Sequence, residues 1–198
     1  MRSHLPVRIR AEAAYNKGVE LSELSRYEDA VGAYRDAIRL TPNYAAAYTN
    51  LGVALSRLGR WEEARLAHAE AVGLTTTSAD AHYDLGVALA TLGRWEEALR
   101  EFRQAVGLAP MDADAYYNMG FTLNSLAVQA YRQAVRVRPD YADAWGNLGL
   151  TAILIGQYRD AVHAFELANA LVPGYFDTRP MQCEAWEGLA RLRAKEGE

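Results

Sequence analysis

Apolar residues recur every three or four positions along most of the chain, and this spacing places them on one face of an α-helix. The region between Ala47 and Val72 contains two such stripes, separated by Gly59–Arg60. A glycine directly after an apolar stripe is typical of a helix C-terminus. The pattern therefore predicts two helices joined by a tight turn. The first stripe consists of Tyr48, Leu51, Gly52, Leu55 and Leu58, and the second of Ala64, His68, Ala71 and Val72.

This pair of helices is one copy of a repeat. The segment AYTNLGVALSRLGRWEEA at Ala47–Ala64 recurs as AHYDLGVALATLGRWEEA at Ala81–Ala98, an offset of 34 residues. Small residues such as Gly52 and Ala64 let two helices approach closely, and large ones such as Tyr48 and His68 fill the remaining gaps. Three kinds of position mark the frame along the chain. They are the glycines Gly18, Gly52, Gly86, Gly120 and Gly149, the alanines Ala30, Ala64, Ala98 and Ala161, and the ring residues Tyr34, His68, Phe102, Tyr131 and Phe165.

These positions, with a proline near most repeat ends, resemble the tetratricopeptide repeat, a helix–turn–helix unit. The resemblance implies an all-α fold, a right-handed superhelical solenoid in which each unit buries its apolar face only on its neighbours. The prolines are Pro42, Pro110, Pro139 and Pro173. The resemblance covers residues 11–175 as five repeats, at 11–44, 45–78, 79–112, 113–141 and 142–175.

The two ends of the chain lie outside this array. We expect residues 1–10 to form a tail or to extend the first helix. Residues 176–198 are expected to form a linker and a capping helix, roughly Met181–Lys195, with its charged residues facing water. The inner face of this helix is predicted to consist of Ala185, Trp186, Leu189 and Ala190.

The fourth repeat lacks its turn. Its segment LNSLAVQAYRQAV, Leu123–Val135, matches LATLGRWEEALREFRQAV, Leu89–Val106, at both ends but has no counterpart of GRWEE. No glycine or proline lies between Phe121 and Arg138, and one apolar stripe crosses the junction in steps of three or four residues. The lost residues are those that would end the first helix.

Three interpretations of this junction are open. The first is a continuous helix from about Ala113 to Val137. The second is a tight hairpin that takes its turn from Leu123–Leu126. The third is that five turn residues are present in the protein and are missing only from the recorded sequence, since turns are where such omissions fall.

A continuous helix has a consequence for assembly, because the two halves of repeat 4 would no longer fold back on each other. Residues 11–126 would present an uncovered first helix, and residues 127–195 an uncovered second helix. Two chains would cover both faces reciprocally as a domain-swapped, two-fold homodimer. The residues expected at this dimer seam are Leu123, Leu126, Ala127 and Ala130.

Composition and charge exclude several classes of protein. The chain of 198 residues has a formal net charge of −4, which gives no reason to expect nucleic acid or an anionic membrane as a partner. A single cysteine, Cys183, excludes an intramolecular disulfide and a cysteine-based metal site. The N-terminal residues lack the apolar core of a signal peptide, so we expect a cytoplasmic protein.

No catalytic constellation is recognisable, so we expect no enzymatic activity, no cofactor and no bound metal. His68 and His82 occupy positions where other repeats have aromatic residues, and we interpret both as packing residues. His163 has no histidine or cysteine at ligand spacing. Cys183 has no histidine near it in sequence, and we interpret it as a buried, inert thiol.

The resemblance implies a scaffold whose first helices line a concave groove for a peptide or a partner helix. The position two residues before the glycine of each repeat forms a ladder along the first helices. An asparagine at this position could bond a peptide main chain through both its donor and its acceptor. The alternative is that these asparagines bond locally to the neighbouring helix. This ladder consists of Asn16, Asn50, Asp84, Asn118 and Asn147.

Beside the ladder, tyrosines and apolar residues would form the floor of the groove or pack successive first helices together. Of the basic residues only Arg57 is placed to project into the groove, and the acids around it argue against an acidic peptide. A neutral or basic peptide partner fits the charge of the groove better. The alternative function that we expect is a self-assembling structural module. The floor residues are Tyr15, Tyr83, Tyr117, Val19, Val53, Val87, Phe121 and Leu150, and the acids are Glu12, Glu23, Asp80, Asp114 and Asp143.

Overall fold

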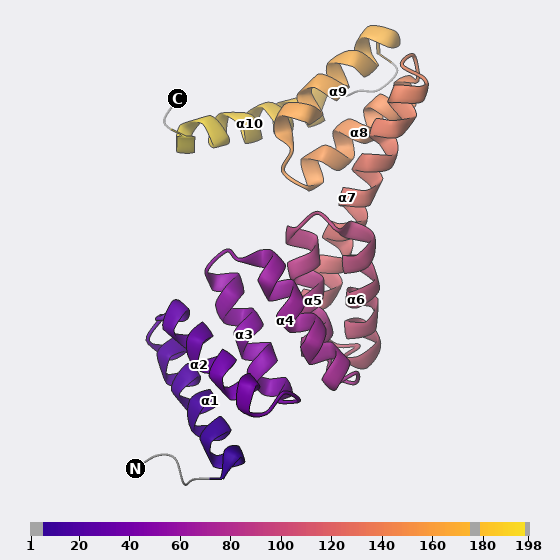
Figure 1. Cartoon of the computed structure of the whole chain (residues 1–198). Coiled ribbons are helices and arrows are strands. Elements are labelled where there is room, and N and C mark those ends of the chain that lie inside the picture. Colours follow the sequence, from indigo (N-terminus) through magenta and orange to yellow (C-terminus); the bar gives the residue numbers. More distant parts are fainter. Residues whose placement is uncertain (1–5, 175–178, 197–198) are drawn as a thin grey trace. The chain divides into compact units, whose positions relative to one another are not determined.

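In a computed structural model that describes residues 6–174 and 179–196, every regular element is a helix (Figure 1). The chain divides into two compact units, residues 1–119 and 120–198, and helix α7 has residues in both. This confirms the predicted all-α repeat fold. The helices are α1 (Val7–Glu23), α2 (Tyr27–Leu40), α3 (Ala45–Arg57), α4 (Trp61–Leu74), α5 (Ala79–Thr91), α6 (Trp95–Leu108), α7 (Ala113–Val137), α8 (Ala142–Leu154), α9 (Tyr158–Leu171) and α10 (Arg179–Glu196).

The first unit consists of three helix pairs followed by the start of α7. Helices α1 and α2, α3 and α4, and α5 and α6 pack as pairs, and α2 also packs against α3 and α4 against α5 (Figure 1). Helix α1 begins at Val7, so residues 7–10 extend the first helix. The apolar stripes of each pair are buried, with Leu51, Leu55 and Ala64 among the core residues of the second pair.

The turns within the pairs have the conformation that their sequence predicts. Gly59, Gly93 and Gly156 follow the ends of first helices with φ of 71°, 73° and 75°, in the left-handed region that glycine enters without steric cost. In the second pair, the Arg60 amide donates to the Leu55 carbonyl at 2.9 Å and closes the helix end. Ser25 takes the same place in the first repeat with φ of 57°.

Glycines of the first helices lie directly against rings of the second helices. A methyl group added to any of these glycines would lie within 2.9 Å of a ring atom, closer than carbon atoms approach in ordinary contact. The close approach predicted from the small residues is therefore confirmed, and the rings fill the space above the missing Cβ atoms. The pairs are Gly18 with Tyr34, Gly52 with His68, Gly86 with Phe102, and Gly149 with Phe165.

Repeat 4 departs from this arrangement because α7 is one helix from Ala113 to Val137. The continuous helix is therefore found instead of the tight hairpin. A methyl group added to Gly120 would meet nothing within 4 Å. The ring of the same repeat, Tyr131, lies eleven residues further along the same helix, about 16 Å away at 1.5 Å per residue. It cannot reach the glycine that it would cover in a hairpin.

The second unit contains the end of α7 and helices α8, α9 and α10. Val128 and Val135 of α7 pack with Ala144 and Leu148 of α8 and with Ala164 of α9. Helix α10 contacts α9 and α8, as a capping helix would. Part of the predicted linker, residues 175–178, lies outside the described residues.

The inner face of α10 is only partly as predicted. Ala185 and Leu189 are buried, but Trp186 is 49% exposed and Ala190 is also exposed. The physical reason is Gly188, because a methyl group there would lie 2.5 Å from the ring of Tyr158 on α9. The face that approaches α9 therefore runs through residues 185, 188 and 189, and Trp186 points away from it.

Candidate functional site

The predicted ladder places one residue on each first helix. Asn16 lies on α1 and is exposed, whereas Asn50 on α3 and Asn118 on α7 are half-buried. Asp84 on α5 and Asn147 on α8 are also half-buried. Asn147 belongs to the second unit and is described only with that unit.

Two of the asparagines bond to the neighbouring first helix. Asn50 donates from Nδ2 to the hydroxyl of Tyr15 at 3.0 Å, and Asn118 donates to the hydroxyl of Tyr83 at 3.1 Å. Asn118 also donates to the carbonyl of Asp114 at 3.0 Å. Each tyrosine is 35 residues before its asparagine, so each bond joins the first helices of consecutive repeats. This is the local alternative anticipated for the ladder.

The same tyrosines are partly core residues. The ring of Tyr15 lies 5.9 Å from Tyr34 and 5.0 Å from Tyr44 between centroids, and Tyr83 meets Phe102 edge to face at 6.0 Å. Burial raises the pKa of Tyr83 above its ordinary value, with the nearby acids adding to the effect. The Tyr83 hydroxyl is therefore a neutral donor and acceptor at physiological pH.

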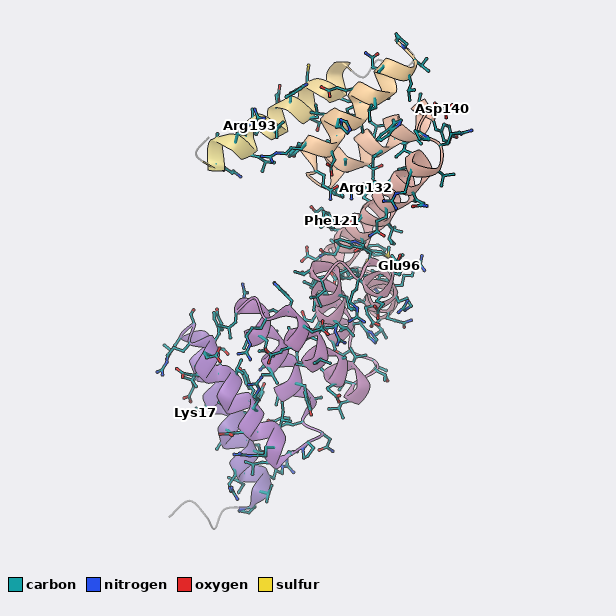
Figure 2. All side chains as sticks on the ribbon, turned by 45° about the horizontal axis from the view of Figure 1, so that its top comes forward. Lys17, Glu96, Phe121, Arg132, Asp140 and Arg193 are labelled. Carbon is teal, nitrogen blue, oxygen red and sulfur yellow. The ribbon has the colours of Figure 1, made fainter. Side chains whose placement is uncertain are left out.

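Residues beside the tyrosine–asparagine pairs differ in how far they reach solvent. Val53 is 40% exposed, Tyr117 is 73% exposed and Phe121, labelled on α7 in Figure 2, is 36% exposed. Val19 and Val87 instead pack against the cores of the first and third pairs. Leu150 likewise packs against the core of the second unit, Tyr15 and Tyr83 are half-buried, and Arg57 in the last turn of α3 is exposed.

At the third position of the ladder, the carboxylate of Asp84 approaches a buried histidine. Oδ2 of Asp84 lies 4.0 Å from Nδ1 of His68, and that nitrogen is buried without a hydrogen-bond partner among the described residues. Burial lowers the pKa of His68 to about 4, and burial with the neighbouring charge of Asp80 raises the pKa of Asp84 to about 6. Desolvation therefore favours the neutral form of both side chains.

Sequence reasoning did not foresee this contact, although each residue was a visible exception to the repeat. Asp84 stands where the other repeats have asparagine, and His68 is the only ring residue of the frame that is not tyrosine or phenylalanine. Repeat 2 also has Thr49 where repeats 1 and 3 have Tyr15 and Tyr83, so Asp84 has no tyrosine hydroxyl to bond. The available signal was the three exceptions in the sequence, of which His68 and Asp84 meet between repeats 2 and 3.

The other residues considered as candidate catalytic or metal-binding groups include His82 and Cys183. No group of three or more histidine, cysteine, aspartate or glutamate side chains that could hold a metal ion occurs among the described residues. His82 is buried and bonds Glu101 at 2.7 Å, as a packing residue would. Cys183 is exposed, so the interpretation of a buried thiol was wrong. Cys183 lies on α10, outside the helix face on which Gly188 approaches Tyr158.

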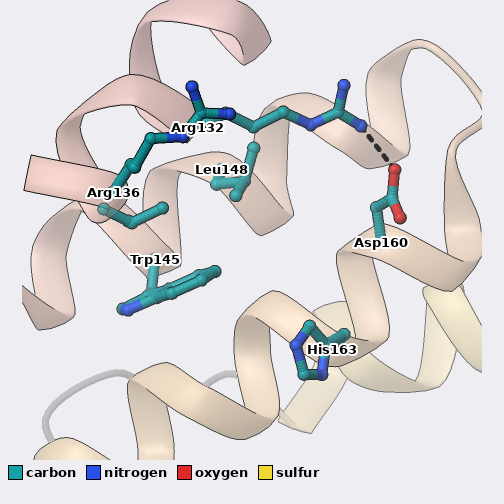
Figure 3. Close-up of a pocket in the computed structure, with 7 residues that line it drawn as sticks. Arg132, Arg136, Trp145, Leu148, Asp160 and His163 are labelled. Atoms are coloured by element: carbon teal, nitrogen blue, oxygen red, sulfur yellow. Dashed lines mark hydrogen bonds and ion pairs between the residues drawn. The ribbon is translucent and has the colours of Figure 1, made fainter. Parts of the chain in front are cut away.

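A cavity of about 320 Å³ in the second unit is lined by side chains of α7, α8 and α9 (Figure 3). Trp145 and His163 meet edge to face there, with ring centroids 6.3 Å apart. The one carboxylate that lines the cavity, Asp160, is held in an ion pair with Arg132 (Figure 3). The same contact joins Arg35 on α2 to Glu63 on α4 at 2.8 Å, so it belongs to the packing of successive second helices.

Among the described residues, no helix is long and apolar enough to cross a membrane. Family models of the repeat match most of the chain between residues 18 and 163. One model, described as TPR repeat, matches residues 18–59 and 90–126, and two models described as tetratricopeptide repeat match residues 45–76 and 130–163. A comparison with curated proteins gave no match.

Solved structures of similar fold cover most of the chain. The crystal structure of MamA is 26% identical with a TM-score of 0.56, over 78% of this chain and 93% of that one. The TPR domain of Arabidopsis OM64 is 25% identical with a TM-score of 0.57, over 59% and 97%. YrrB, described as a TPR protein with an unusual peptide-binding site, is 23% identical with a TM-score of 0.57, over 88% and 90%, and shows the fold alone. With its helix pairs and glycine–ring contacts, the chain belongs to the tetratricopeptide repeat family.

Proposed function

We propose that the chain is a non-catalytic scaffold that binds an extended peptide or a partner helix on the face formed by the first helices α1, α3 and α5 and by the start of α7. The observation that carries this proposal is the recurrence of a polar pair on that face beside exposed apolar side chains. Tyr15 with Asn50 and Tyr83 with Asn118 form the polar pairs. Val53 and Tyr117 supply the apolar surface beside them.

The spacing of these positions suits an extended chain. Neighbouring packed helices lie about 8–10 Å apart, and an extended peptide advances about 3.3 Å per residue. Consecutive ladder positions would therefore meet about every third peptide residue. Contacts to the main chain at this interval would fix the path of a peptide without recognising most of its side chains. The apolar residues beside the ladder would supply the selectivity for particular side chains.

Charge on this face favours a neutral or basic peptide. Asp84 lies in the middle of the row, and with a pKa of about 6 it is largely ionised at neutral pH. Asp80 and Asp114 are exposed on the same helices, and Arg57 is the predicted cation among them. A peptide with a basic side chain opposite Asp84 would gain a charge-assisted hydrogen bond there.

The test is a double substitution of ladder asparagines. Peptides selected from a displayed library by the purified chain would be measured by fluorescence anisotropy against Asn50→Ala/Asn118→Ala, for which we expect at least a tenfold weaker Kd. Asn169→Ala, on the second helix α9, is the matched control and should bind normally. Tyr15→Phe/Tyr83→Phe separates the two roles of the asparagines, because it removes their tyrosine partners and keeps both amides. Undiminished binding by the double asparagine variant, with an intact fold, would refute the ladder.

A second candidate function is self-assembly, as a domain-swapped homodimer through repeat 4. The observation that favours it is that α7 is one helix, so its first half is not covered by its own second half. The contact expected within repeat 4 is then available to a second chain. Light scattering over a dilution series is the measurement, and a monomer that persists at every concentration contradicts this function without bearing on peptide binding.

A further inference from the structure

Helix α7 carries an apolar stripe that the described residues leave partly open. Its members alternate in steps of four and three residues, the spacing of a helix that packs along its length against another helix. Tyr116 is 47% exposed, Leu123 44% and Val137 74%, and Ala130 is also exposed. The other members are half-buried, and Ala134 packs against the core of the second unit. We call these residues the α7 stripe: Tyr116, Gly120, Leu123, Ala127, Ala130, Ala134 and Val137.

The surroundings of the α7 stripe are unusual for a surface helix. From Ala115 to Tyr131 the helix has no charged side chain, although about a quarter of the residues in a soluble domain are charged. A long, uncharged and partly exposed helix face is typical of a surface that another chain covers. The charged residues of α7 are Asp114, Arg132 and Arg136, and Arg132 is paired with Asp160.

Other repeats show what covers the equivalent face. In repeat 1, Leu21 on the first helix is buried with Ala30, Ala33 and Tyr34 on the second, and the ring of Tyr34 lies against Gly18. In the frame of the repeats, the corresponding residues of repeat 4 are Leu123 and Gly120 on one half of α7 and Ala127, Ala130 and Tyr131 on the other half. Both surfaces of the missing contact are therefore present in α7.

These two surfaces cannot meet within one molecule. Gly120 and Ala130 are ten residues apart on one helix, which separates them by about 15 Å. A second copy of the chain presents the same two surfaces in the opposite order when its α7 runs antiparallel. Each half of one α7 then faces the other half of its partner, and a single two-fold axis covers the exposed residues of both halves.

We propose that two copies of this chain pair antiparallel along the α7 stripe, with the two-fold axis beside Ser125. This proposal rests on the self-association put forward above and specifies its contact. Gly120 of one chain lies against Ala130 and Tyr131 of the partner subunit. The partner is a second copy because this chain itself carries both complementary surfaces, in the register that its other repeats use.

The antiparallel register pairs large residues with small ones. Positions whose numbers add up to 250 face each other, so Tyr116 packs on Ala134 of the partner subunit and Leu123 on Ala127 of the partner subunit. The small residues allow the helices to approach closely, as in the glycine–ring contacts of the other repeats. Shifting the register by one heptad would place Leu123 against Ala134 of the partner subunit and leave Tyr116 without an opposing alanine.

Cysteine cross-linking of the full chain tests this register. In a Cys183→Ser background, which removes the exposed native thiol, the variant Gly120→Cys/Ala130→Cys is oxidised or treated with a short bis-maleimide. We expect the covalent dimer to be the main product. An intrachain bond is excluded because about 15 Å is far beyond the Cα separation of a disulfide.

The controls are the two single-cysteine variants and Gly120→Cys/Arg136→Cys, in which the second thiol is about 9 Å out of register. All three are expected to remain largely uncross-linked. Efficient cross-linking of Gly120→Cys alone would overturn the proposed register, because it places two copies of Gly120 side by side. Circular dichroism before treatment reports folding, since a folded variant keeps the parent spectrum.

Light scattering on the same samples separates the two levels of the proposal. A dimer without the 120–130 cross-link overturns the register and leaves self-association standing. A monomer at all concentrations overturns both. Neither result bears on peptide binding by the first-helix face, which uses Asn50 and Tyr15 in the first unit.

Discussion

Replacing Gly86 by alanine is expected to destabilise the protein, although alanine favours a helix more than glycine does. The new methyl group would lie 2.8 Å from Cε1 and 2.9 Å from Cδ1 of Phe102, whereas carbon atoms in ordinary contact are about 3.5–4.0 Å apart. Phe102 is 0% exposed and packs with Leu85, Leu89 and Ala98. Its ring can therefore move only by displacing other core residues.

The expected magnitude follows from two opposing effects. Overpacking of this kind destabilises by about 1–3 kcal/mol, and the higher helix propensity of alanine returns about 1 kcal/mol. The net loss is about 1 kcal/mol, or a Tm lower by about 2–4 °C for a chain of this length. At Gly32, in the middle of α2, a methyl group would meet nothing within 4 Å. Gly32→Ala should therefore stabilise by about 0.5–1 kcal/mol.

The assay is urea and thermal denaturation followed by far-UV circular dichroism, at one protein concentration because self-association would add to the stability. The same chemical change at Gly86 and Gly32 is expected to shift the midpoint in opposite directions. Phe102→Leu in the Gly86→Ala background should recover part of the loss, and a double-mutant cycle measures that coupling. If Gly86→Ala proves as stable as Gly32→Ala, the reasoning from the glycine–ring contact is wrong.

Three further predictions concern other parts of the chain. Burial raises the pKa of Asp84 to about 6 and lowers that of His68 to about 4. Between pH 4 and 6 the two side chains together therefore hold about one proton in the folded chain and about one in the unfolded chain. The opposite effects of the two residues on the pH dependence of stability then cancel. His68→Phe should therefore make stability fall with rising pH in that window and Asp84→Asn should make it rise, by up to about 1.4 kcal/mol per pH unit in urea titrations. Leu189→Ala should loosen α10 by about 2–3 kcal/mol in hydrogen exchange, and Trp186→Ala by less than 1, because only Leu189 is buried. Intact mass spectrometry should return the mass of the 198-residue sequence. A mass greater by five residues would mean that repeat 4 has its turn residues and folds as a hairpin.

The fold was predictable because its signals are local and are repeated. A glycine at the turns of repeats 2, 3 and 5, a small residue at each close approach and a ring at each gap define one helix pair. The 34-residue offset of Ala47–Ala64 to Ala81–Ala98 copies this pair along the chain. Even the exception followed local rules, since α7 is continuous where the glycine stop is missing. Helix continuity depends on residues within a few positions of the junction, which a sequence displays directly.

The details of the site depended on contacts between distant residues. The hydrogen bond from Asn50 to Tyr15 joins positions 35 residues apart. The ladder pattern alone did not indicate which group would accept the hydrogen bond of the amide. The outward position of Trp186 follows from the contact of Gly188 with Tyr158, which sets the rotation of α10. Rotation of a terminal helix by one residue position leaves its periodicity unchanged, so the apolar pattern could not distinguish the two faces.

Reinserting GRWEE after Leu126 provides the last prediction, because it returns to repeat 4 the turn that the other repeats use. Closing the hairpin within one chain proceeds at an effective concentration in the millimolar range, whereas a second chain in a light-scattering sample is present at micromolar concentration. The intramolecular contact is thus favoured about a thousandfold, or about 4 kcal/mol, and the variant should be a monomer. The inserted glycine should matter, since Gly59 and Gly93 have φ of 71° and 73°, and alanine in that conformation costs about 1–2 kcal/mol. Insertion of ARWEE should therefore leave about tenfold more dimer, and a GRWEE variant that stays dimeric at every dilution would mean that the dimer does not form through repeat 4.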